Sequence, residues 1–289
     1  MTITVKIIAD SINTATDDRI TTFLCRYPRF IHSEIMTHRV CSRNAASSRA
    51  IPIARLIEMV ENDPAMPVVW GKNQKGMQAS KYLSENETKD AKELWEEARD
   101  YAVGMAWELN HLGVHKQIAN RILEPYAHIE TLITATEWGN FFNLRCHKDA
   151  QPEFQKLTYD MIVAYNRSTP NTLYPGKWHL PFSDKGIQHW LSEENKRKVV
   201  VARAARTSYY NFEGEIDYVK DFTLHDDLLA SGHMSPFEHP AKADTESRWN
   251  GNFEGWIPYR KLIAGENKKD FDPVELIKGS MFYQEGDEL

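Results

Sequence analysis

The sequence is short of cysteine, of long apolar runs and of positive charge. Its three cysteines, Cys25, Cys41 and Cys146, are odd in number and form no Cys-x-x-Cys pair, so neither a disulfide framework nor a zinc knuckle is supported. No apolar run approaches the roughly 18 residues that a membrane-spanning helix requires, and residues 1–18 contain no cationic region followed by a long apolar one. The formal net charge of -6 argues against a general nucleic-acid-binding surface. We therefore expect a cytoplasmic protein with no nucleic-acid and no membrane partner.

The chain is long enough to bury a substantial core. With 289 residues, of which 42% are hydrophobic, it can form one large domain. We expect a single catalytic domain over residues 1–289 in three parts. Residues 1–62 hold two extended segments and a basic motif, residues 84–166 hold several helices, and residues 197–265 hold two further motifs.

Local patterns predict individual elements along the chain. Residues 4–12 alternate as a strand does, and residues 20–36 indicate a second extended segment bent at Pro28. Ser84 begins a capping box, so we expect a helix from there to Gly113. A long loop is predicted at 63–82, irregular structure at 168–190, and further helices at 51–62, 114–123, 126–143, 150–166, 192–209 and 222–232.

Residues 37–49, THRVCSRNAASSR, form a cluster of hydrogen-bond donors without a single carboxylate. Its three arginines and three serines precede a predicted helix, and such donors suit a phosphate or another anion. A solvated basic loop would have the same composition. Cys41 lies between Arg39 and Arg43, and nearby cations favour a nucleophilic thiolate, although a small buried cysteine is the commoner case. Both alternatives stay open at this point.

Two further clusters combine charged and polar side chains. Residues 140–154 read NFFNLRCHKDAQPEF and residues 232–240 read GHMSPFEHP. Helix-end charges and ordinary turn chemistry explain most clusters of these kinds, so chemistry alone leaves their roles open. The side chains concerned are Arg145, His147, Asp149, Gln151 and Glu153 in the first cluster, and His233, Ser235, Glu238 and His239 in the second.

Two other patterns do not support a site. His111 and His115 are four residues apart on a predicted helix, but the glutamate of a metalloprotease pair and a nearby third ligand are missing. Residues 71–77, GKNQKGM, lack the Lys-Ser/Thr pair of a phosphate loop. We therefore expect structural histidines and no metal.

The three clusters together resemble one family. His38 and Arg39, followed after seven residues by Ser47, are similar to the RHRx7S signature of flavin-dependent thymidylate synthases, with Thr37 in place of the first arginine. Residues 144–153 are similar to the LRxxxxAQxE segment of that family, and residues 232–239 to its GHxSPFEH segment, preceded here by ARTSY at 205–209. The order differs from that of typical members, where the last two segments come first, and a circular permutation would explain it.

The resemblance implies a fold and a reaction. The fold would be α+β, a twisted, largely antiparallel sheet flanked by long helices, in a homotetramer with shared active sites. The reaction would transfer a methylene group from methylenetetrahydrofolate to C5 of dUMP and reduce it to methyl with a hydride from FAD, which NADPH recharges. Because members of this family need no enzyme thiol, Cys41 would be a bystander.

The resemblance also assigns roles to individual residues. Arg145 would face the pyrimidine ring, where a cation stabilises developing charge, and His233 would lie near folate and flavin. We take Arg145, Ser47 and His233 as the catalytic set. The expected nucleotide contacts are Ser47, Ser48, Arg49, Arg121 and Arg145. The expected FAD contacts are His38, Arg39, Val40, Asn44, Asn140, Leu144, Ser208, Ser235 and Glu238.

Several positions depart from the family pattern. Thr37 removes a guanidinium on the flavin side, and Asp149 replaces a histidine. Ala45 replaces a glutamate, Ala50 replaces a tyrosine, and Ser48 takes the place of a glycine. More of these changes fall among the nucleotide contacts than among the flavin contacts. A related pyrimidine nucleotide as substrate, or a hydroxymethylated product, is therefore an alternative. A thiol-dependent methyltransferase using Cys41 and an inactive nucleotide-binding homologue are the others.

Overall fold

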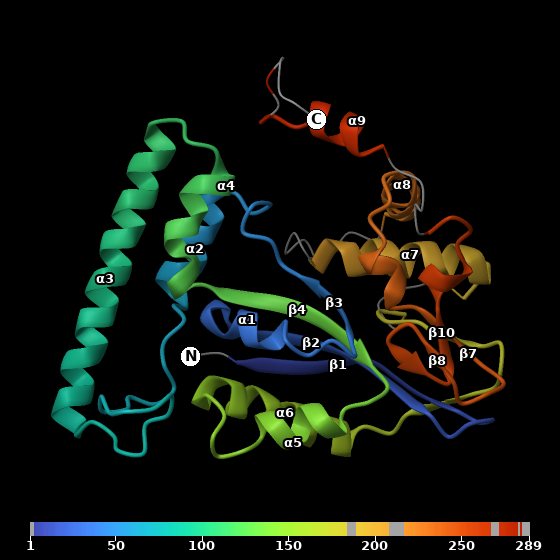
Figure 1. Cartoon of the computed structure of the whole chain (residues 1–289), viewed down its shortest axis with the longest axis horizontal. Coiled ribbons are helices and arrows are strands. Elements are labelled where there is room, and N and C mark those ends of the chain that lie inside the picture. The colour runs from blue at the N-terminus through green and yellow to red at the C-terminus, as the bar shows by residue number, and fades with distance from the viewer. Residues whose placement is uncertain (1–2, 184–188, 208–216, 267–271, 283, 285–289) are drawn as a thin grey trace.

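A computed structural model describes residues 3–183, 189–207, 217–266, 272–282 and 284 (Figure 1). A five-stranded sheet lies at its centre, with strand order β3-β4-β2-β1-β5. Strand β5 runs parallel to β1, and the other neighbours are antiparallel. The fold is therefore α+β with a largely antiparallel sheet, as expected. The strands are β1 (Thr4–Asn13), β2 (Arg19–Pro28), β3 (Ser42–Ala45), β4 (His128–Ala135) and β5 (Asn171–Leu173).

Helices cover both faces of this sheet because alternate residues of β2 point to opposite sides. Phe23 on β2 packs in one core cluster with Phe154 and Leu157 of helix α6 (Pro152–Arg167). Leu24, the next residue, packs in another cluster with Ala204 of helix α7 (Glu193–Arg206). Figure 1 shows α6 on one side of the sheet and α7 on the other.

A helical layer stands beside the sheet and has its own apolar core. It contains α2 (Ile53–Asn62), α3 (Glu85–His111), α4 (Lys116–Ala119) and the 3-10 helix η2 (Asn120–Tyr126). Ile57 and Val60 of α2 pack there against Val103 and Ala106 of α3. Helix α3 begins where the sequence predicts, because Ser84 and Glu87 form the reciprocal hydrogen bonds of a capping box.

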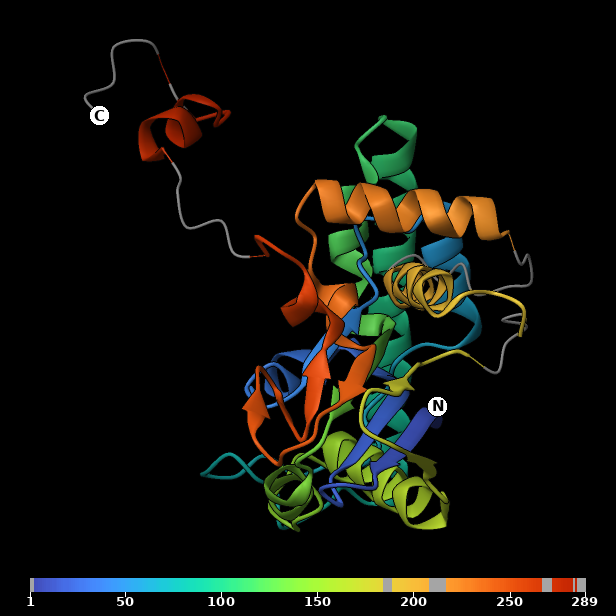
Figure 2. The same ribbon diagram turned by 90° about the vertical axis from the view of Figure 1, so that its right-hand side faces the viewer.

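The C-terminal part brings two small sheets against the central one (Figure 2). Strands β10, β7 and β6 form a three-stranded sheet in that order, and β8 pairs with β9. Trp256 and Phe253 pack there with Ile20 of β2. The elements are β6 (Trp178–His179), α8 (Tyr218–Ala230), the 3-10 helix η4 (Ser235–Glu238), β7 (Ala241–Ala243), β8 (Trp249–Asn250), β9 (Phe253–Glu254), β10 (Trp256–Pro258), the 3-10 helix η5 (Tyr259–Leu262) and α9 (Pro273–Lys278).

A chain of buried polar side chains joins this C-terminal part to the central sheet. His179 contacts Ser11 through Nδ1 and Thr22 through Nε2, both at 2.9 Å. Thr22 contacts Thr134 at 2.7 Å, and Thr134 contacts Nδ1 of His239 at 2.8 Å. All five residues are buried. Because buried polar groups need partners, this chain fixes β6 and the segment after η4 on the sheet.

The structure corrects three predicted elements. The helix predicted at 126–143 is wrong, because residues 128–135, rich in Ile and Thr, form the fully paired strand β4, and only Gly139–Arg145 is helical as α5. The extended segment 20–36 ends at Pro28, and residues 29–35 form a 3-10 turn (Arg29–Ile31) and helix α1 (His32–Ile35). The region 168–190 contains the short strands β5 and β6.

Most other predicted elements are confirmed. Strand β1 and the helices near 51–62, 84–113, 150–166 and 222–232 appear with ends shifted by a few residues, and the segment predicted as a helix at 114–123 is split between α4 and η2. Helix α7 confirms the helix predicted at 192–209, of which residues 208 and 209 lie outside the described residues. No helix among the described residues is both long and apolar enough to cross a membrane. That residues 1–289 form a single catalytic domain stays a prediction.

Candidate active site

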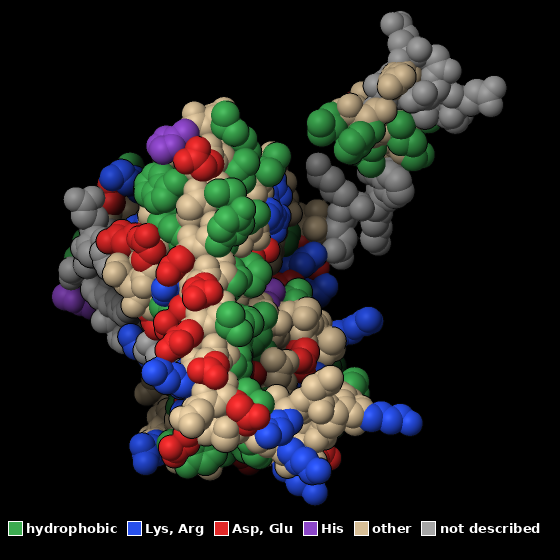
Figure 3. Space-filling model, turned by 90° about the vertical axis from the view of Figure 1, so that its left-hand side faces the viewer, with side chains coloured by type: hydrophobic (Ala, Val, Ile, Leu, Met, Phe, Trp, Pro, Cys, Tyr) green, Lys and Arg blue, Asp and Glu red, His purple; other side chains and the backbone are tan. Residues whose placement is uncertain are grey.

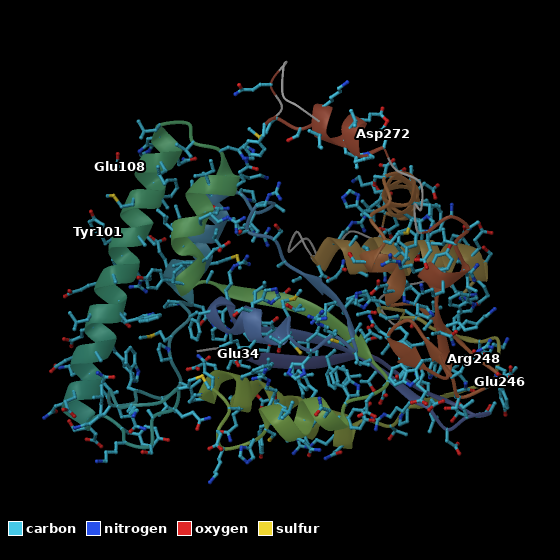
Figure 4. All side chains as sticks on the ribbon, viewed as in Figure 1. Glu34, Tyr101, Glu108, Glu246, Arg248 and Asp272 are labelled. Carbon is cyan, nitrogen blue, oxygen red and sulfur yellow. The ribbon has the colours of Figure 1, made fainter. Side chains whose placement is uncertain are left out.

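The motif at residues 37–49 and the motif at residues 140–154 meet at the guanidinium of Arg145. Its Nε donates to His38 Nε2 at 2.8 Å, one η-nitrogen donates to Glu34 Oε2 at 2.8 Å, and the other donates to Thr37 Oγ1 at 3.3 Å. The guanidinium carbon also lies 4.7 Å from the ring centroid of Phe154. Helix α1 presents Glu34 (Figure 4), and α5 ends at Arg145. The fold thus joins two segments that are more than a hundred residues apart.

The environment of His38 keeps its imidazole neutral. Partial burial, and then the nearby charges of Arg145 and Arg43, lower the pKa of His38. A neutral imidazole that accepts the Arg145 hydrogen bond at Nε2 carries its proton on Nδ1. The ring packs edge-to-face on Phe141 at 4.7 Å. His38 is therefore held in one orientation from two sides.

A cavity of about 310 Å³ lies beside this cluster. Four expected flavin contacts share its wall, namely His38, Arg39, Val40 and Asn140. Trp138 also lines it, and the buried indole Nε1–H of this residue has no partner among the described residues. The nitrogen itself is covered by other atoms, so Trp138 contributes the surface of its ring to the cavity wall. Sites for small ligands commonly have volumes of roughly 300 Å³ and above.

Cys41 does not have the properties of a nucleophile. Burial, only partly offset by Arg43 and reinforced by Glu238, raises the pKa of the thiol. The Sγ atom contacts the His38 carbonyl at 3.4 Å. Arg43 does favour the thiolate, as expected, but desolvation outweighs its charge and the net change in the pKa of Cys41 is upward. This environment favours the protonated thiol over the thiolate.

The third motif, at residues 232–240, lies against the motif at residues 37–49. Helix η4 packs on β3, and Glu238 shares the wall of a second cavity, of about 220 Å³, with Ser42 and Arg260. Arg260 donates to Glu238 at 2.6 Å. Asn252 closes the junction by donating to the Cys41 carbonyl at 3.2 Å and to Ser42 Oγ at 3.3 Å.

Asn44 is turned away from the 310 Å³ cavity and toward helix α7. Its Nδ2 approaches the Ala204 carbonyl at 3.4 Å, and its buried Oδ1 has no partner among the described residues. Helix α7 leads into the ARTSY stretch. Ser208, an expected flavin contact in that stretch, lies outside the described residues, so the structure leaves its role a prediction.

The expected nucleotide contacts Ser48 and Arg121 meet at a residue that the sequence did not single out. Ser48 Oγ donates to Glu124 Oε1 at 2.6 Å, and Arg121 donates to the same oxygen at 2.9 Å. Arg29 approaches it at 3.1 Å. Ser47 begins the same turn, since its carbonyl accepts the Ala50 N–H, and Arg49 is exposed within it.

Other residues assigned by the resemblance are not drawn into these clusters. Leu144 and Ser235 are exposed, and His233 contacts Ser231 at 2.8 Å, a residue of its own turn. Among the described residues, no hydrogen bond or ion pair joins Arg145 to Ser47 or Arg49. In the segment 140–154, Asp149 pairs with His147 at 3.5 Å on the surface. The roles expected for these side chains therefore stay predictions.

The two histidines of the rejected metal pattern have structural environments. His115 caps α4 by accepting the Gln117 N–H at 3.3 Å, and His111 stacks on Trp107. Among the described residues, no group of three or more His, Cys, Asp and Glu side chains could hold a metal ion.

Sequence patterns missed Glu34, Trp138 and Glu124. Glu34 is four residues before His38, and its acidity beside an otherwise basic motif was the available signal. Trp138 and Glu124 had none, because both lie in segments whose place beside the motifs is set by strand β4 and helix η2. Their importance comes from contacts between distant parts of the chain.

Comparison with known proteins places the chain in a family. The family model described as thymidylate synthase complementing protein matches residues 7–171. No curated protein matches. Two structures of the UMP/dUMP methylase PolB from Streptomyces cacaoi, bound with 5-Br dUMP and 5-Br UMP, are similar with TM-scores of 0.48 and 0.47, 17% identity, and coverage of 57% of this chain and 90% and 89% of theirs.

The matched residues contain both motifs that meet at Arg145, whereas the ARTSY and GHMSPFEH segments lie beyond residue 171. The third motif is thus outside the match in sequence and against β3 in space. Since the match spans more than half of the chain, the protein belongs to the thymidylate synthase complementing protein family.

Proposed function

We propose that this protein methylates dUMP, or a closely related pyrimidine nucleotide, at C5, with FAD as cofactor, methylenetetrahydrofolate as one-carbon donor and NADPH as reductant. The observation that carries the proposal is the contact of Arg145 with His38, which joins two family motifs beside a cavity of about 310 Å³. Family membership supports methylation of a dUMP-like nucleotide. The choice of flavin as cofactor, of the folate as one-carbon donor and of NADPH as reductant follows from the family resemblance.

The residues around the cavity fit a flavin. Trp138, Phe141 and His38 offer aromatic surface to a planar ring. His38, Arg39, Val40 and Asn140 would hold the cofactor. Thr37 supplies a hydroxyl where the family has a guanidinium, which leaves Arg39 as the cation of that wall. When bound, the flavin supplies the hydride chemistry of the reaction.

The chain itself contributes position and charge. Glu34 and His38 hold the Arg145 guanidinium from two directions, so the cation is oriented before a substrate arrives. A fixed cation next to a pyrimidine ring stabilises negative charge that develops during the reaction. Ser48 and Arg121 offer a hydroxyl and a guanidinium to the nucleotide phosphate. The buried aromatic residues Phe141 and Phe154 keep water from one side of this cluster.

Tritium release from C5-labelled dUMP tests the proposal. Release should require methylenetetrahydrofolate, NADPH and FAD together, and the purified protein should show a flavin absorbance that NADPH bleaches. The variant Arg145→Gln should lower kcat by about 100-fold or more, as loss of a charge-stabilising group does. Arg167→Gln, an equal change at an exposed position on α6, is the matched control. Release that continues without flavin would refute the proposal, as would full activity of Arg145→Gln.

The substrate is tested in the same assay. Ala45 stands where the family has a glutamate and Ala50 where it has a tyrosine, both near the nucleotide. The compounds dUMP, UMP and dCMP should therefore be compared directly. The proposal expects dUMP to have the highest kcat/KM, and analysis of the product distinguishes a methyl from a hydroxymethyl group. Binding of dUMP without any turnover would instead identify an inactive homologue.

We also propose self-assembly, as the resemblance implies for a homotetramer. Figure 3 shows apolar side chains along α3 next to a row of acidic ones. Leu94, Tyr101 and Leu112 are exposed there, and the spacing of seven and eleven residues places them on one helix face. A second copy of this chain would cover the stripe. Sedimentation should show an assembly that Tyr101→Glu weakens, and a monomeric wild-type protein would refute this part.

A further inference from the structure

We propose that the Glu124 carboxylate competes with the phosphate of the nucleotide for the same hydrogen-bond donors. By this competition it controls which ligands bind in that part of the site. One carboxylate oxygen of Glu124 accepts hydrogen bonds from the hydroxyl of Ser48 and the guanidinium of Arg121, and it forms an ion pair with the guanidinium of Arg29. The inference rests on the proposed function in one respect, because it takes the competing anion to be the phosphate of a nucleotide.

The donors around Glu124 are those that a phosphate would use. Their distances to Oε1 are 2.6 Å from Ser48, 2.9 Å from Arg121 and 3.1 Å from Arg29. Arginine and serine donors recognise carboxylate and phosphate oxygens by the same charge-assisted hydrogen bonds. The carboxylate therefore occupies the position that a phosphate oxygen would take among these three side chains.

The turn that carries Ser48 is fixed independently of Glu124. The buried Asn120 donates to the carbonyls of Ser48 at 2.7 Å and of Ile51 at 2.9 Å. Lys116 donates to the Ala50 carbonyl at 2.9 Å. These contacts reach the backbone of the turn from α4 and η2. The backbone that carries Ser48 would thus stay in place when the Glu124 side chain moves away.

The Glu124 side chain is free enough to leave. It is 24% exposed, and Arg121 is 51% exposed. An arriving phosphate must displace the carboxylate, and it does so by bringing a larger negative charge to the same two guanidinium groups. A nucleoside or a weak monoanion cannot, so the carboxylate selects for a phosphorylated ligand. It also neutralises Arg29 and Arg121 while the site is empty.

Removal of the carboxylate charge tests this inference. In Glu124→Gln the amide oxygen still accepts hydrogen bonds, but the competing charge is gone. Calorimetry should show roughly tenfold tighter binding of both dUMP and inorganic phosphate, a gain of about 1.4 kcal/mol, because the like charge that competes with the phosphate has been removed. Deoxyuridine, which has no phosphate, should bind as before. Glu246→Gln, an equal charge change at an exposed position (Figure 4), should change none of the three affinities.

The outcomes separate this inference from the proposed function. Unchanged or weaker phosphate and dUMP binding by Glu124→Gln, or no binding by either protein, would overturn the inference. If that variant does not fold, Glu124→Ala removes the same charge and is held to the same standard. Tritium release by the wild type with no gain in affinity would overturn the inference alone. Tenfold tighter phosphate binding in a protein that never releases tritium would overturn only the proposed function.

Discussion

The buried histidines of the polar chain make stability depend on pH in a defined direction. Burial lowers the pKa of His179 to about 3, and burial together with the neighbouring His179 lowers that of His239 to about 3. In the unfolded chain both would titrate near 6.5. As the pH falls through 6.5 the unfolded chain binds these protons and the folded protein does not. Protons therefore favour unfolding, and stability decreases from about pH 6.5 downwards.

The size of the effect follows from the number of histidines that stay neutral. Each one lowers the free energy of unfolding by about 1.4 kcal/mol per pH unit below its unfolded pKa. His32 and His128, whose pKa burial lowers to about 4, add to the slope over the same range. A domain is stable by roughly 5–15 kcal/mol, so this protein should unfold well above pH 3.

A single substitution isolates one histidine. In His239→Asn the amide can replace Nδ1 in the contact with Thr134, and Nε2 has no partner among the described residues that would be lost. Urea unfolding of this variant at pH 6 and pH 5 should show a slope that is smaller than the wild-type slope by about 1.4 kcal/mol per pH unit. The same change at the exposed His189 should leave the slope unaltered. Equal slopes in all three proteins would refute the reasoning, whatever their absolute stabilities.

Three further predictions concern single side chains. Ser84→Ala removes the capping box of α3 and should cost about 1 kcal/mol in urea unfolding, whereas a loss below experimental error would contradict the capping role. Phe154→Ala empties a fully buried position and should cost about 3–5 kcal/mol, and it should also lower the rate of tritium release because the ring supports Arg145. Cys41→Ser keeps a donor to the His38 carbonyl and should leave tritium release largely intact, while abolished turnover would restore the thiol hypothesis.

Local sequence determined the elements whose signals lie within a few residues of one another. The start of α3 follows from the Ser84 and Glu87 pair, which needs only one helical turn to form. Strand β1 follows from alternation, and the end of β2 from Pro28. The motifs around His38 and Arg145 could be named in advance because their residue types and spacing are themselves the signal, and the family match includes both.

Only the tertiary structure decided how these pieces meet. Strand β4 was predicted as a helix because its apolar pattern fits either element, and pairing on both edges with β2 and β3 settles it as a strand. The charge of Arg145 is oriented by Glu34 and His38, and the pKa of Cys41 is raised because burial outweighs the charge of Arg43. Glu124 meets Ser48 only because η2 packs behind the turn. Burial and long-range contacts leave no local pattern in the sequence. The sequence therefore determined which reactive residue types are present, and the tertiary structure determined which of them lie in contact.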